Sequence, residues 1–199
     1  VNINNKIMKL CEGNDELVDY SINYIFEIAT KQKTYCKQYV KLIKNFISKN
    51  EDLKSKIEDI TSNYKEINSA SNIKNSQHLS YDDFCENNKL KVYKQGYSQL
   101  IGELFLNNII GYQIIIDNII YMIKYLDICL KNEDVNQELI EELIICVNEL
   151  ILTILNRLKF NDLKNIYSYL VFFYKNKKIQ KRLIFKIMDL KDKIQPLLK

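Results

Sequence analysis

The sequence predicts an all-α fold, and three observations support that prediction. The 199 residues include only four glycines and one proline, the residues that interrupt helices and form tight turns. Apolar side chains recur every three or four residues over almost the whole chain, which is the spacing of one helix face. With 47% hydrophobic residues, the chain can build one substantial core without metals or disulfides. We therefore expect a single domain, residues 1–199, with about nine helices.

The first half of the chain contains four predicted helices. A short helix at about 3–10 ends at Gly13, and Asn14 or Asp15 caps the second helix, which continues past Ala29. The third helix covers about 34–48, and the fourth about 51–67. The apolar side of the third helix contains Tyr35, Tyr39, Leu42, Ile43, Phe46 and Ile47. The following segment, 68–80, is rich in Ser and Asn, so we expect a long flexible loop inside the domain.

The second half of the chain predicts further helices joined by short links. Ser80 with Asp83 resembles a capped start for a helix, or helix pair, that continues to about 105. After a turn at Gly111 and Tyr112, the remaining helices cover about 115–130, 139–155, 162–174 and 177–194, and Pro196 ends the pattern. The 139–155 helix is apolar on more than one side, which predicts a central position. Short links favour antiparallel neighbours, so we expect a HEAT-like array of antiparallel helical hairpins, an α-α superhelix.

The sequence shows no recognisable catalytic or metal-binding pattern. The single histidine, His78, lies in the polar loop without the oriented partner that a general base needs. The five cysteines are scattered and lack zinc-ligand spacing, so we expect buried free thiols in a reducing compartment. No apolar run reaches the roughly 18 residues of a membrane span. We expect a cytoplasmic binding protein without enzymatic activity, cofactor, metal or membrane partner.

Two groups of basic residues are candidates for RNA binding. The face of the third helix opposite its apolar side carries Lys33, Lys37, Lys41 and Lys44. A second basic group, near the end of the chain, contains Lys175, Lys177, Lys178, Lys181, Arg182 and Lys186, of which Lys178, Lys181 and Arg182 are the RNA-binding candidates. Either group could be an ordinary solvated face, because the net charge is only +4. Alternatively, each could hold RNA phosphates in a salt-sensitive and sequence-independent way.

Aromatic residues are abundant, and the fourteen tyrosines raise the question of base stacking. Most of them fall on or beside apolar helix faces. We therefore expect them to pack in the core with the hydroxyl group at the surface.

Three segments in order carry a family resemblance. The first is Ile25-Phe26-Glu27 with Ala29, followed by Tyr35 and Tyr39 at a characteristic spacing. The second is Gly96 followed by Ile101-Gly102-Glu103-Leu104-Phe105, and the third is Leu183 with Ile187-Met188-Asp189-Leu190-Lys191. Together they resemble the middle domain of eukaryotic translation initiation factor 4G and its relatives, over residues 3–191. The segments 52–56 and 192–196 depart from the family's pattern.

The resemblance implies a HEAT-repeat scaffold that docks a DEAD-box helicase, initiation factor 4A, contacts RNA and recruits other initiation factors. Its helicase contacts map onto Val18, Ile22 and Phe26 at one end and onto Leu183, Ile187 and Asp189 at the other. Phe26 could instead belong to the core. The alternative is an RNA-binding or messenger-ribonucleoprotein adaptor of the same fold without helicase docking. Relatives of that kind serve in poly(A)-binding-protein interaction, nonsense-mediated decay or cap binding.

Overall fold

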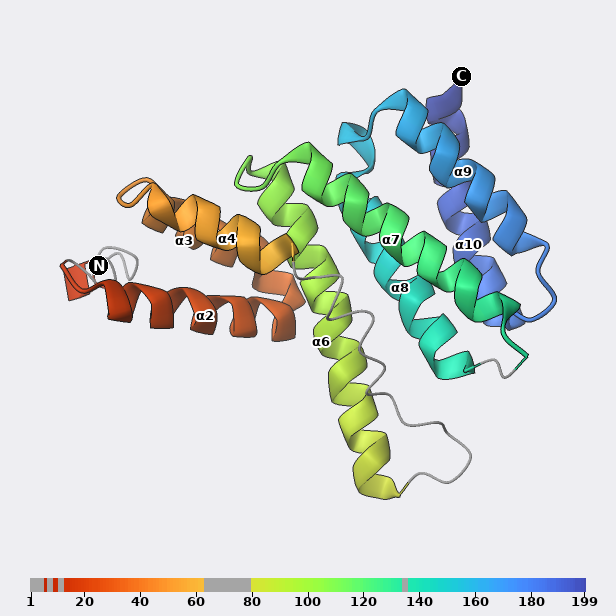
Figure 1. Ribbon diagram of the computed structural model, residues 1–199, viewed down its shortest axis with the longest axis horizontal. Helices are drawn as coiled ribbons and strands as arrows, with labels where there is room; N and C mark the ends of the chain where they lie inside the picture. Colours follow the sequence, from red (N-terminus) through yellow and green to blue (C-terminus); the bar gives the residue numbers. More distant parts are fainter. Residues whose placement is uncertain (1–5, 7–8, 11–12, 63–79, 134–135) are drawn as a thin grey trace.

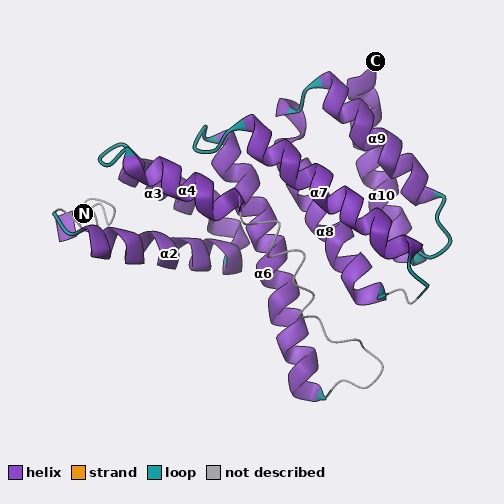
Figure 2. Cartoon of the chain, in the orientation of Figure 1, coloured by secondary structure: helices purple, strands orange, loops and turns teal. Residues whose placement is uncertain are grey.

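The computed structural model describes residues 6, 9–10, 13–62, 80–133 and 136–199, and these ranges contain helices and no strand (Figures 1 and 2). The prediction of an all-α fold is confirmed. Short 3₁₀ turns occur at Lys33–Tyr35, Leu155–Arg157 and Gln195–Leu198. The α-helices in the described ranges are α2 (Asp15–Lys31), α3 (Cys36–Ile47), α4 (Asp52–Ser62), α6 (Tyr81–Leu106), α7 (Tyr112–Lys131), α8 (Gln137–Ile154), α9 (Phe160–Tyr174) and α10 (Lys181–Ile194).

Two predicted caps begin their helices as expected. The Asn14 side-chain oxygen accepts a hydrogen bond from the backbone N–H of Leu17, 3.0 Å away, at the start of α2. The Ser80 hydroxyl accepts one from the N–H of Asp83, 3.1 Å away, at the start of α6. Each bond satisfies a backbone donor that has no partner within the helix.

The helices form a continuous array around one hydrophobic core. α2 packs against α3 and α6, α6 packs against α8, and α8 also packs against α7 and α10. α9 packs against α10 at the C-terminal end, so α2 and α10 lie on opposite sides of the molecule (Figure 1). The core runs from Val18 in α2 to Ile194 in α10. The predicted central position of α8 is confirmed, because this helix packs against α6, α7 and α10.

α6 is one continuous helix of 26 residues, which decides between the predicted single helix and helix pair. It contains two glycines at close crossings. A Cβ atom added to Gly96 would lie 1.8 Å from the carbonyl oxygen of Thr30 in α2, and one added to Gly102 would lie 2.7 Å from Cγ2 of Thr153 in α8. Close helix packing therefore offsets the cost of a glycine inside a helix.

Some predicted boundaries were wrong. The last helix begins at Lys181 instead of 177, because residues before it form a turn in which the Asn176 side chain accepts from the N–H of Lys178 at 2.9 Å. The third helix begins with a 3₁₀ turn that leaves Tyr35 56% exposed, whereas we expected it on the apolar side. The predicted loop 68–80, apart from Ser80, lies outside the described residues, as do most of the first helix and the end of the fourth.

Candidate interaction surfaces

Five of the six predicted helicase contacts lie in the hydrophobic core. On α2, Val18, Ile22 and Phe26 are buried, and on α10, Leu183 and Ile187 are buried, so none of these side chains forms an exposed surface. Asp189 alone is exposed. These five side chains carry the regular apolar spacing of an amphipathic helix, and such side chains pack against the neighbouring helices.

A different flank of α2 presents apolar groups to solvent. Tyr20 and Tyr24 are 68% and 52% exposed, and their rings stack with centroids 6.3 Å apart. Leu17 lies one turn before them and is 36% exposed. This stripe was not predicted, although the spacing 17, 20 and 24 follows one side of a helix.

Two lysines of the first basic group lie beside carboxylates of other helices. Lys33 Nζ lies 3.2 Å from a carboxylate oxygen of Glu149 in α8, and Lys37 Nζ lies 3.9 Å from one of Glu103 in α6. Both contacts tie the start of α3 to the centre of the array. Lys41 and Lys44 are exposed and form no ion pair within the described residues. Lys37 is 72% exposed despite its carboxylate neighbour, so Lys37, Lys41 and Lys44 all present ammonium groups to solvent, whereas Lys33 is only 30% exposed.

Charged side chains meet in the interior between α6 and α8. Lys94 Nζ lies 2.5 Å from Glu142 Oε1, and both side chains are 1% exposed. Burial raises the pKa of the Glu142 carboxyl, and the opposing charge of Lys94 lowers it by less. A buried ion pair contributes little net stability, but either charge alone would be strongly destabilising.

The ion pair continues toward the surface as a network. Lys91 in α6 pairs with Glu138 and lies 3.6 Å from Glu141, both in α8. Arg182 at the start of α10 lies 2.9 Å from the same Glu141. We call the side chains that join α6, α8 and α10 in this way the charged seam: Lys91, Lys94, Glu138, Glu141, Glu142 and Arg182.

The charged seam was not predicted from the sequence. A usable signal was present, because Lys94 and Glu142 each lie within the apolar stripe of its helix. Lys94 is one turn from Tyr97, and Glu142 is one turn from Leu139. Opposite charges inside two apolar stripes predict a buried pair once the two helices are known to be neighbours.

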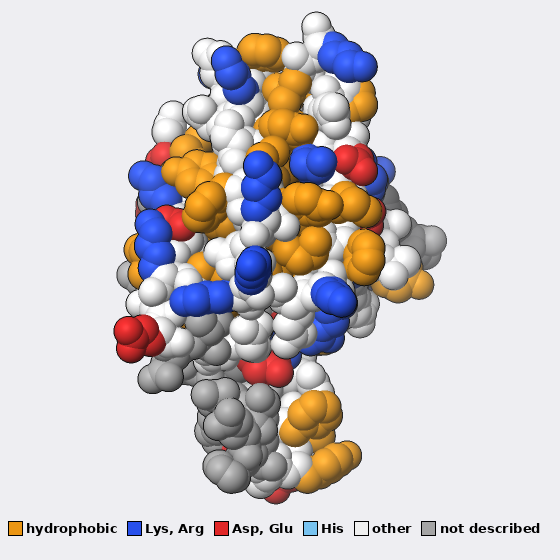
Figure 3. All heavy atoms as spheres, turned by 90° about the vertical axis from the view of Figure 1, so that its right-hand side faces the viewer, with side chains coloured by type: hydrophobic (Ala, Val, Ile, Leu, Met, Phe, Trp, Pro, Cys, Tyr) orange, Lys and Arg blue, Asp and Glu red, His pale blue; other side chains and the backbone are white. Residues whose placement is uncertain are grey.

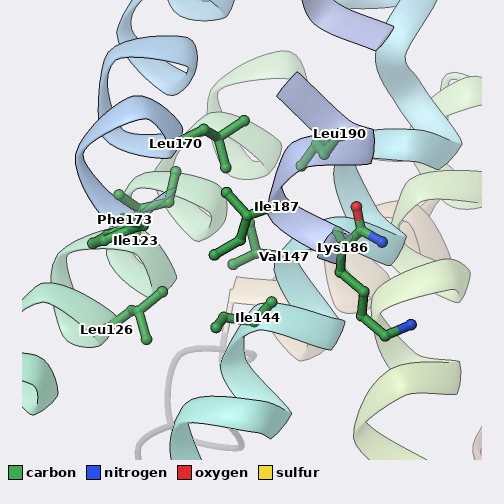
Figure 4. Close-up of a pocket in the computed structure, with 10 residues that line it drawn as sticks. Ile123, Leu126, Ile144, Val147, Leu170, Phe173, Lys186, Ile187 and Leu190 are labelled. Carbon is green, nitrogen blue, oxygen red and sulfur yellow. The ribbon is translucent and has the colours of Figure 1, made fainter. Parts of the chain in front are cut away.

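Two cavities in the described part of the chain lie beside α8. The apolar cavity in Figure 4 lies between α7, α8, α9 and α10, where Ile144, Leu170 and Ile187 face one another. Its volume is about 10 Å³, the lower limit for one water molecule, so it is a packing gap. A shallow groove of about 210 Å³ lies along the charged seam and is lined in part by Cys146. Burial raises the pKa of that thiol to about 12, so Cys146 is not a nucleophile at neutral pH.

The outer face of the α9–α10 hairpin combines basic and aromatic groups, as Figure 3 shows for this side of the molecule. Phe172, Tyr174 and Phe185 are 53%, 41% and 60% exposed. Of the predicted RNA-binding residues, Lys178 donates to the Asn132 carbonyl at 2.8 Å and Arg182 belongs to the charged seam. Lys181 is exposed without an ion pair in the described ranges. The cations on this face were predicted as candidates, but the exposed aromatic groups beside them were not.

Two further tests concern membranes and metals. None of the described helices is both long enough and apolar enough to cross a membrane. The described part of the chain also brings together no group of three or more metal-ligating side chains.

The resemblance to the initiation factor 4G family rests on the three sequence segments, because the comparisons with known proteins add no match. No family model, curated protein or solved structure matches the chain.

Proposed function

We propose that the chain is a HEAT-type scaffold domain of the initiation factor 4G kind, which docks a DEAD-box helicase in the cytoplasm and contacts RNA without catalysing a reaction. The first and third family-like segments lie in α2 and α10, and this separation supports the proposal. α2 and α10 lie on opposite sides of the array (Figure 1). A DEAD-box helicase has two lobes, so contacts at two separated places can hold both lobes at once.

The proposed contacts use exposed side chains in place of the buried ones. At the α2 end they are Leu17, Tyr20 and Tyr24, which offer apolar and aromatic area. At the α10 end the contact is Asp189, which is exposed and has no ion pair among the described residues. An exposed carboxylate fits a basic patch on the helicase and contributes to orientation and association rate.

The proposed mechanism is conformational. A scaffold that binds each lobe at a fixed separation favours a half-open helicase, in which ATP and RNA exchange faster. The scaffold can shift this equilibrium only by its difference in affinity for the open and closed forms. No chemical step by the scaffold is needed.

The decisive experiment measures binding of the cognate helicase and stimulation of its ATPase. Each isolated helicase lobe is titrated against the wild-type domain, Tyr20→Ala/Tyr24→Ala and Asp189→Lys. We expect each variant to weaken binding of a different lobe. The expected loss for Asp189→Lys is under about 1 kcal/mol if the pair stays exposed and a few kcal/mol if docking buries it.

Asp117→Lys is the matched control, because Asp117 is an exposed carboxylate on α7, away from both proposed contacts. It should leave helicase binding unchanged. If the wild-type domain neither binds the helicase nor stimulates its ATPase, helicase docking is wrong. The second candidate, an RNA-binding adaptor, is then preferred, and the basic outer face of α9–α10 is the observation that favours it.

A further inference from the structure

The end of the chain carries an uneven share of the charge. Residues 160–199 contain ten Lys and Arg against three Asp, a net charge of +7, whereas the whole chain is only +4. Many of these cations surround the α9–α10 hairpin. Lys175, Lys177, Lys181 and Lys186 are exposed and form no ion pair within the described residues. This end of the molecule is therefore a local site of positive potential.

Exposed aromatic rings lie among these cations. Phe185, in the first half of α10, is 60% exposed and has no ring contact within the described residues. Tyr174, at the end of α9, has the ammonium group of Lys191 5.4 Å from its ring centroid. Figure 3 shows apolar and basic side chains interleaved over this face. Large rings exposed to solvent offer apolar area that a partner can cover.

The neighbours of Phe185 decide what kind of partner fits. On a helix, the residues three and four positions away share its face. Here they are Lys181, Arg182, Met188 and Asp189, so two cations lie one turn before the ring and one apolar and one acidic side chain lie one turn after it. A membrane or a partner helix is met by a continuous apolar face, whereas basic side chains interrupt the apolar ones on this side of the molecule (Figure 3). A ring with cations one turn before it fits a base that stacks on it while its phosphates meet ammonium groups.

We propose that the outer face of α9–α10 binds single-stranded nucleic acid, with a base stacked on Phe185 and phosphates held by Lys181 and Lys186. The proposal deepens the RNA contact of the proposed function and rests on it for the identity of the strand as RNA. A duplex fits less well, because its bases are already stacked on one another and cannot reach the ring. Tyr174 and Phe172 offer further stacking area on the same hairpin.

The test measures fluorescence anisotropy of a labelled oligouridylate of about 20 nucleotides, longer than one domain covers. The same measurement is made with an RNA duplex of equal length. We expect the single strand to bind more tightly. Phe185→Ala should weaken its binding about ten-fold, while Phe185→Tyr keeps a ring and should retain most of the affinity. The matched control is Phe84→Ala on α6, which removes a ring of similar exposure, 54%, far from the hairpin.

The lysines are tested separately through salt dependence. Lys181→Gln/Lys186→Gln removes two cations, so the slope of log affinity against log salt should fall by about 1.4 for a single strand. Phe185→Ala should leave this slope unchanged, because it removes no charge. This difference separates stacking from phosphate contacts.

Several outcomes would overturn the proposal. Equal affinity of wild type and Phe185→Ala, or tighter binding of the duplex, would leave only phosphate contacts. Binding of the domain to phosphatidylserine vesicles but not to oligouridylate would identify the face as a membrane surface. Helicase binding by the wild-type domain is measured in parallel. A helicase that binds while Phe185→Ala has no effect on RNA refutes this proposal alone.

Discussion

The charged seam and the outer face of α9–α10 both concentrate charge, yet they use it in opposite ways. In the charged seam, the side chains of Lys94 and Glu142 are each 1% exposed and neutralise each other, so a binding partner cannot contact either charge. On the outer face, Lys181 and Lys186 are exposed without ion pairs in the described ranges. The comparison shows that counting lysines along a sequence does not locate a binding surface. A cation with a carboxylate beside it contributes less to the field outside the molecule than an exposed cation without one.

The largest expected effect comes from breaking the seam at its buried pair. Lys94→Met leaves the Glu142 carboxylate buried without its cation, so the free energy of unfolding should fall by about 3–5 kcal/mol. The double variant Lys94→Met/Glu142→Leu removes both charges and should recover most of that loss. Urea unfolding followed by circular dichroism measures both values.

Lys164→Met on the exposed side of α9 is the control and should change stability by less than about 0.5 kcal/mol. A double variant no more stable than Lys94→Met would show that the pair does more than neutralise itself. The contrast between buried and exposed charge would then need another explanation.

A smaller effect is expected from the packing beside the seam. In Gly102→Ala, the new Cβ lies 2.7 Å from Thr153 Cγ2, which should cost about 1–3 kcal/mol despite the better helix propensity of alanine. Thr153→Ser removes that methyl group and should recover part of the cost. Gly111→Ala, where no atom lies within 4 Å of the added Cβ, is the control for unfolding in urea. A stabilised Gly102→Ala would contradict tight packing between α6 and α8.

The smallest effect on stability should come from the outer face. Lys181→Gln/Lys186→Gln changes two exposed side chains, so the free energy of unfolding should change by less than about 0.5 kcal/mol. The same urea titration tests this, next to the salt-dependence experiment. A loss above about 1 kcal/mol would mean that these lysines serve the fold, and the two regions would no longer differ in kind.

The helices were predictable because their signals are local. Apolar spacing placed α7 and α8, and the Asn14 and Ser80 caps began α2 and α6 as expected. The boundary at Lys181 was not predictable from spacing, because Asn176 ends the helical pattern through a side-chain hydrogen bond to the backbone.

The surfaces were harder to predict because they depend on which helix covers which face. Ile22 and Leu183 carry the apolar spacing that marks a helix face, but neighbouring helices cover that face. Lys33 reads as a surface cation, yet Glu149, far along the chain, lies beside it. Such pairs form only when the array is assembled. Phe185 remained unnoticed because one exposed ring among charges has no periodic signal.

The two glycines of α6 have a consequence for how this chain can change in evolution. At Gly96 the backbone of α2 packs closely against α6, and at Gly102 a side chain of α8 does. One residue inserted between the two glycines would rotate one of these contact sites about the axis of α6, relative to the other, by about 100°. Loops could lengthen without harm, but the six-residue distance between these glycines could not. Distant relatives should therefore keep the spacing between these two glycines even where few other residues can be aligned.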